Sequence, residues 1–142
     1  MIAVFDIDGV LADASHREHH VSGKPKDWDA FFDAVGDDAV IEAGRTRLRD
    51  EAASHEVVLL SGRPERCRAE TVAWLARNGM EAGTLLLRPD SDRRPAPVFK
   101  AGLIRSIGGP EEVVVVIDDD DRVLARLAEM GYHTESFPQP LR

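Results

Sequence analysis

The sequence is poor in cysteine and contains no long apolar stretch, and both absences narrow what the protein can be. Cys67 is the single cysteine, which excludes an internal disulfide framework and a cysteine-rich zinc site. No apolar run is long enough to span a membrane. The N-terminus begins directly with an apolar strand pattern and lacks the basic start and cleavage site of a signal peptide. We therefore expect a cytoplasmic protein.

The chain also has fewer positively charged residues than acidic ones. The formal net charge of −8 disfavours a broad nucleic-acid-binding surface, which depends on many Lys and Arg contacts to phosphates. A local basic pocket stays compatible with this charge, because acidic residues grouped around a metal would account for part of the excess. The chain also lacks any Gly-x-x-x-x-Gly-Lys-Ser/Thr sequence. We therefore expect no kinase activity from this chain.

What the sequence does contain is a regular alternation of short apolar runs and amphipathic segments. At 142 residues with 43% hydrophobic content, we expect one domain, residues 1–142. Strands are predicted at residues 2–5, 56–60, 84–87, 113–117 and 132–137, and helices at 39–54, 65–78, 98–107 and 123–130. This order predicts a three-layer α/β/α Rossmann-like sandwich with a central parallel five-stranded sheet.

Residues 12–38 form a polar, irregular stretch that is long for a connection between elements. Connections longer than about a dozen residues are usually functional or disordered. This one carries Trp28, Phe31 and Phe32. We expect a short helix that folds back as a minimal cap loop over the site. The three rings are expected to form the small core of this loop rather than to stack on nucleic-acid bases.

Polar side chains follow the first four predicted strands at the points where these strands end. Because the carboxyl ends of parallel strands meet at one edge of a sheet, we expect these side chains to line a single pocket. The residues are Asp6 and Asp8 after the first strand, Ser61 and Arg63 after the second, Arg88 after the third, and Asp118 and Asp119 after the fourth.

The aspartates indicate a metal site. On a continuing strand Asp6 and Asp8 would share a face, and Gly9 allows a tight turn directly behind them. Carboxylates so close repel each other unless a cation or a shared proton compensates. Mg²⁺ prefers oxygen ligands and typically binds one or two carboxylates. The alternative, a solvated acidic turn, is disfavoured at residues 118–121 by the buried aliphatic run before them.

Taken together, the motifs resemble a known group of enzymes. The combination of Asp6-x-Asp8-Gly9, Ser61, Lys100 and Asp118-Asp119 is similar to the four motifs of the haloacid dehalogenase-like (HAD) phosphohydrolase superfamily, over essentially the whole chain. Within it, the chain most resembles the 3′-phosphatase domain of phage polynucleotide kinase and its bacterial relatives. This closer likeness rests on Arg17, Ser61-Gly62-Arg63 and Arg88-Pro89-x-x-Asp92-x-Arg94.

The resemblance has two departures. Ala96 stands where the phage enzyme carries an acid, and Val10 replaces the commoner Thr.

The resemblance implies a role for each motif residue. Asp6 would attack phosphorus, and Asp8 would act as general acid and then as general base. Ser61 and Lys100 would stabilise the charge on the transferring phosphoryl group. The resemblance implies that Mg²⁺ is bound by Asp6, the backbone carbonyl of Asp8, and Asp118, with Asp119 either a further ligand or a residue that contacts a ligand. It implies that substrate is bound by Arg17, Gly62, Arg63 and Arg88.

The implied substrate is a 3′-phosphate at a nucleic-acid end. Three alternatives stay open: a phosphatase of free nucleotides or other small phosphoesters, a non-catalytic module that binds phosphate or metal, and a phosphotransferase. The missing P-loop leaves room for a separate kinase or ligase partner, or for a larger protein of which this chain is one part.

Overall fold

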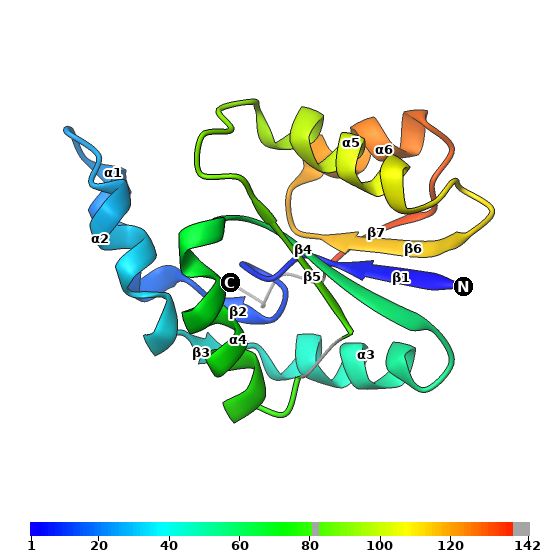
Figure 1. Cartoon of the computed structure of the whole chain (residues 1–142), viewed down its shortest axis with the longest axis horizontal. Helices are drawn as coiled ribbons and strands as arrows, with labels where there is room; N and C mark the ends of the chain where they lie inside the picture. Colours follow the sequence, from blue (N-terminus) through cyan, green and yellow to red (C-terminus); the bar gives the residue numbers. More distant parts are fainter. Residues whose placement is uncertain (81–82, 138–142) are drawn as a thin grey trace.

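Five parallel strands form the centre of the computed structural model, which describes residues 1–80 and 83–137 (Figure 1). Their spatial order is β5-β4-β1-β6-β7, so β1 lies in the middle with β4 and β6 beside it. The strand bounds are β1 (Ile2–Phe5), β4 (Glu56–Pro64), β5 (Thr84–Arg88), β6 (Val113–Asp118) and β7 (Thr134–Ser136). This sheet confirms the predicted fold class.

Helices cover both faces of the sheet (Figure 1). Helices α5 (Ala96–Ile107) and α6 (Asp121–Glu129) lie on one face, and α3 (Glu42–Ala52) and α4 (Arg68–Arg77) lie on the other. Alternate residues of β1 point to opposite faces, so Ala3 and Phe5 join the core beneath α3 and α4 while Val4 joins the core beneath α5 and α6. The result is the three-layer sandwich that the strand and helix alternation predicts.

A helical insert follows β1 at one end of the sheet. Its stem is a two-stranded antiparallel ribbon, in which β2 (Ala12–Asp13) pairs with β3 (Ala39–Val40). Between these strands lie the 3₁₀ turns η1 (Ser15–Arg17) and η2 (Val35–Asp37) and the short helices α1 (His19–Ser22) and α2 (Trp28–Asp33). Helices α1 and α2 project away from the sandwich (Figure 1).

Several boundaries differ from the sequence prediction. The helix predicted at 39–54 was wrong at its start, because Ala39 and Val40 pair with the ribbon and α3 begins at Glu42. Strand β4 continues to Pro64, so Ser61 and Arg63 lie within the strand rather than in a turn after it. Helix α4 is preceded by the 3₁₀ turn η3 (Glu65–Cys67). In residues 1–80 and 83–137, no helix is long and apolar enough to cross a membrane.

Candidate active site

A pocket of about 460 Å³ lies where β1 and β6 end. Six of the residues predicted for the site line it: Asp6, Asp8, Gly62, Lys100, Asp118 and Asp119. They come from the segment after β1, from the last residue of β6 and the residue after it, from β4 and from α5. The structure thus brings together the polar ends of three neighbouring strands, as expected for the carboxyl edge of a parallel sheet.

The backbone after β1 fixes where the first two aspartates lie. The Asp6 amide still donates to the Ile117 carbonyl at 3.0 Å, which ties this residue to β6. A tight turn then begins at Ile7, whose carbonyl accepts from the amides of residues 10–12. Gly9 adopts φ +85, and a Cβ there would overlap Oδ2 of Asp119. Glycine is required at this position both for its backbone angle and for the space that Asp119 occupies.

Three carboxylates crowd together at the floor of the pocket. Asp6, Asp118 and Asp119 each offer an oxygen, and these oxygens lie within 4.8 Å of one another. Burial raises the pKa of Asp6 well above its ordinary value, and the neighbouring aspartates add to this while Lys100 opposes it. Burial and the charge of Asp118 likewise raise the pKa of Asp119 to about 6. A cluster of repelling hard oxygen donors fits a divalent cation such as Mg²⁺.

Lys100 is the cation of this cluster. Its Nζ lies 2.7 Å from Oδ2 of Asp118 and 3.1 Å from Oδ1 of Asp6. Burial alone would lower the pKa of Lys100, but the two carboxylates outweigh burial and raise it. Lys100 is therefore a fixed positive charge at neutral pH, held between two aspartates that come from different strands.

The carboxylate of Asp8 points away from the acidic cluster and toward two arginines. Nη2 of Arg17 lies 2.7 Å from its Oδ1, and Nη2 of Arg63 lies 2.8 Å from the same oxygen. Both arginine side chains are 0% exposed. Burial would raise the pKa of Asp8, but Arg63 and Arg17 outweigh it and lower the pKa. Asp8 is therefore ionised at neutral pH and fixed in orientation.

Asp38 joins the two arginines to each other, and the sequence analysis missed it. Its carboxylate accepts from Nε of Arg17 at 2.8 Å and from Nη2 of Arg63 at 2.9 Å. It also lies 2.6 Å from Nε2 of His16. The indole of Trp74 donates to the Asp38 carbonyl at 2.8 Å. Asp38 thereby connects the helical insert to β4 and α4.

Ser61 lies beneath the pocket instead of lining it. Its side chain is buried, and its Oγ accepts from the amide of Arg63 at 3.1 Å. The hydroxyl therefore shapes the backbone at the end of β4, next to Gly62, which does line the pocket.

Arg88 does not lie with Arg17 and Arg63. Its guanidinium packs over the ring of Phe99, 4.3 Å from the centroid, and Nη1 donates to the Arg94 carbonyl at 2.7 Å. It lines a second pocket next to the first, and Gly62 lines both. The structure thus divides the predicted substrate-binding arginines between two places.

Comparison with known proteins agrees with this geometry. A family model described as the polynucleotide kinase PNKP phosphatase domain matches residues 1–135. No curated protein matches the chain. Among solved structures, the Pnkp1/Rnl/Hen1 RNA repair complex contains a chain with a TM-score of 0.78 and 22% identity. That match covers 95% of this chain and 41% of the other, so this chain spans less than half of that one.

Two further solved structures show the same fold. A class C acid phosphatase from Bacillus anthracis with tungstate bound gives a TM-score of 0.66 at 18% identity, over 99% of this chain and 68% of the other. A HAD family enzyme from Bacteroides thetaiotaomicron, in complex with magnesium and inorganic phosphate, gives a TM-score of 0.61 at 14% identity. That match covers 99% of this chain and 96% of the other. At these identities the likeness concerns the fold alone.

Proposed function

Because this chain belongs to the family of polynucleotide kinase PNKP phosphatase domains, we propose that it is a Mg²⁺-dependent phosphatase that removes 3′-phosphates from nucleic-acid ends. Residues 1–142 would serve as its phosphatase domain. One observation carries the proposal: a buried aspartate, Asp6, lies in a pocket beside two further carboxylates and a fixed lysine, with a second aspartate held next to it by arginines. The Pnkp1 chain of similar fold belongs to an RNA repair complex, which supports a nucleic-acid substrate.

Asp6 is the proposed nucleophile. One of its carboxylate oxygens bonds to phosphorus while the bond from phosphorus to the 3′ oxygen breaks, giving an aspartyl-phosphate. Lys100, 3.1 Å from Asp6, favours the ionised form of this carboxylate and would stabilise the charge that builds up on the phosphoryl oxygens. Asp6, Asp118, Asp119 and the backbone carbonyl of Asp8 would hold Mg²⁺, which supplies positive charge against phosphate oxygens.

Asp8 is the proposed acid and base. It gives a proton to the leaving 3′ oxygen, and it then takes a proton from the water that attacks phosphorus and releases inorganic phosphate. Its low pKa suits the second step directly. For the first step, an incoming phosphate dianion would raise the pKa of Asp8 and favour its protonation. Arg17 and Arg63 orient the carboxylate for both transfers.

The remaining substrate contacts are proposed for backbone and arginine groups. Gly62 lines the pocket without a side chain, which leaves its backbone open to phosphate. Arg17 lines neither pocket, and the group through which it would contact substrate is Nη1, which is buried without a hydrogen-bond partner among the residues that the structure describes. Ser61 would act from beneath by holding the backbone at Arg63.

The test is phosphate release, with Mg²⁺ and with chelator, from three substrates: an oligonucleotide with a 3′-phosphate, the same oligonucleotide with a 5′-phosphate, and a free 3′-mononucleotide. We expect metal-dependent release that strongly favours the 3′-phosphorylated oligonucleotide. A preference for the mononucleotide would assign the protein to nucleotide metabolism. No metal-dependent release from any of the three would contradict the proposal.

A further inference from the structure

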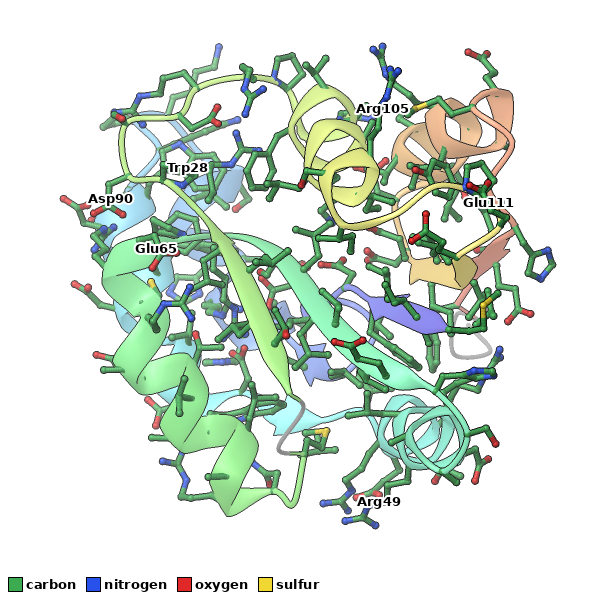
Figure 2. All side chains as sticks on the ribbon, turned by 45° about the vertical axis from the view of Figure 1, so that its right-hand side comes forward. Trp28, Arg49, Glu65, Asp90, Arg105 and Glu111 are labelled. Atoms are coloured by element: carbon green, nitrogen blue, oxygen red, sulfur yellow. The ribbon has the colours of Figure 1, made fainter. Side chains whose placement is uncertain are left out.

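The second pocket contains an exposed aromatic platform that the catalytic site does not use. This outer pocket, of about 450 Å³, is lined by Trp28, Asp29 and Phe32 of α2, by Gly62 and Pro64 of β4, by Arg66, and by residues 88–90 and 92–94 at and after the end of β5. Figure 2 shows Trp28 and Asp90 on the same side of the molecule. Gly62 lines both pockets, so the outer pocket begins where the catalytic pocket ends.

Trp28 is presented to solvent by the aromatic residues behind it. Its ring stacks on Phe32, with centroids 5.9 Å apart and an interplanar angle of 23°, and it meets the edge of Phe31 at 5.7 Å. The three rings therefore do pack together, as expected, yet 49% of Trp28 is exposed. An indole that packs on Phe32 and is still half exposed is a stacking surface for a planar group.

The charges around this platform favour an anionic ligand, in a chain whose net charge is −8. Four arginines and three aspartates line the outer pocket, a local excess of one positive charge: Arg66, Arg88, Arg93 and Arg94 against Asp29, Asp90 and Asp92. Lys26 adds a cation 5.7 Å from the Trp28 ring.

The aspartates oppose this excess only weakly. Asp92 is 10% exposed as a side chain and lies 2.7 Å from Nη2 of Arg94, whose own side chain is 55% exposed. The carboxylate thus points inward while the arginine reaches solvent. Arg66 pairs with Asp29 at 3.0 Å and with Asp33 at 3.5 Å, but these aspartate side chains are 87% and 73% exposed, and such surface pairs contribute little and leave Arg66 available to another anion.

We propose that the outer pocket binds the nucleotides just upstream of the 3′-phosphate, with a base stacked on Trp28 and the connecting phosphodiesters near Arg66, Arg93 and Arg94. Stacking on an aromatic ring together with nearby cations is how proteins hold single strands without reading their sequence. The inference rests on the proposed function, and it deepens it by assigning the surface that would hold the polymer upstream of its 3′ end.

The first test compares Trp28→Ala with wild type on a 3′-phosphorylated oligonucleotide and on the 3′-mononucleotide. We expect kcat/KM to fall about tenfold on the oligonucleotide and to stay unchanged on the mononucleotide, which lacks the upstream nucleotides that the outer pocket would bind. Trp28→Phe, which keeps an aromatic face, should restore most of the activity. Val72→Ala, at another exposed apolar residue on α4, is the matched control and should behave like wild type. Equal effects of Trp28→Ala on both substrates, or on neither, would overturn the inference.

Arg93→Gln tests the electrostatic part. Arg93 is exposed, so its replacement leaves the core intact. The slope of log kcat/KM against log salt concentration should become shallower by roughly 0.7 for the oligonucleotide, as expected for the loss of one contact to a single-strand phosphate. An unchanged slope would contradict a phosphate contact at Arg93.

A binding measurement separates this inference from the proposed function. In an Asp6→Asn background, which prevents turnover, the oligonucleotide should quench the fluorescence of Trp28, and Trp28→Phe should abolish the quenching because Trp74 is buried. Quenching without turnover in the wild type would support the outer pocket and contradict the phosphatase proposal. Turnover of the oligonucleotide without quenching would support the phosphatase proposal and contradict binding at the outer pocket.

Discussion

Replacing Asp38 with Asn gives the most demanding test of the buried charge network. Two arginines and two aspartates balance there, and the side chains of Arg17, Arg63 and Asp38 are 0% exposed. Asp38→Asn keeps the shape but leaves one buried positive charge without compensation. Breaking a buried pair in this way costs about 3–5 kcal/mol, which corresponds to a fall in Tm of roughly 10–20 °C for a chain of this size.

The assay is thermal unfolding at neutral pH, together with kcat on the 3′-phosphorylated oligonucleotide. Asp37→Asn is the matched control, since Asp37 is the exposed neighbour and its replacement should change stability by less than about 0.5 kcal/mol. If Asp38→Asn fails to fold, Thr71→Val provides a milder test. It removes one hydrogen-bond acceptor from Arg63 and should lower the free energy of unfolding by about 1–3 kcal/mol. Equal Tm values for Asp38→Asn and Asp37→Asn would refute the reasoning.

Three further predictions concern the acidic cluster. Gly9→Ala should abolish the rise in Tm that Mg²⁺ produces, because its Cβ would displace the Asp119 carboxylate; an unchanged rise would contradict the close approach. Lys100→Met should lower kcat by about 100-fold or more by removing the cation beside Asp6, whereas Arg105→Met at an exposed position of α5 should not. Without metal, the folded chain keeps protons on Asp6 and Asp119 that the unfolded chain releases, so its stability should fall as pH rises from 3.8 through about 6. Mg²⁺ should accordingly raise Tm more at pH 8 than at pH 5. A larger rise at pH 5 would contradict the raised pKa values of Asp6 and Asp119.

The sequence predicted the sheet and the acidic cluster because both follow from local patterns. Runs such as residues 113–117 are too apolar and too β-branched to lie outside a buried strand. Once the strands are parallel, the residues that follow them must meet at one edge of the sheet. This is why Asp6, Asp118 and Asp119 could be expected together from the strand pattern, whereas Lys100 lies on α5 and was expected there only from the resemblance to the HAD motifs.

The position of Arg88 could not be predicted in this way. A strand end fixes which edge of the sheet a residue lies on, but the direction of its side chain depends on the segment that follows. Here the carbonyl of Arg94 and the ring of Phe99 hold the guanidinium in the outer pocket.

Asp38 escaped the sequence analysis for a different reason. It follows the exposed Asp37 in an irregular stretch, and no motif or periodicity separates the two. The need for a buried anion becomes visible only when Arg17 and Arg63, which are far apart in the sequence, are seen to share one interior site.

The central claim is that Asp6 takes the phosphoryl group from the substrate. The most direct measurement is acid quenching during turnover of an oligonucleotide that carries a radiolabelled 3′-phosphate, followed by detection of label on the protein. We predict transient, hydroxylamine-sensitive label on the wild-type chain and none on Asp6→Asn. Label on Asp6→Asn, or phosphate release by that variant at the wild-type rate, would contradict the account.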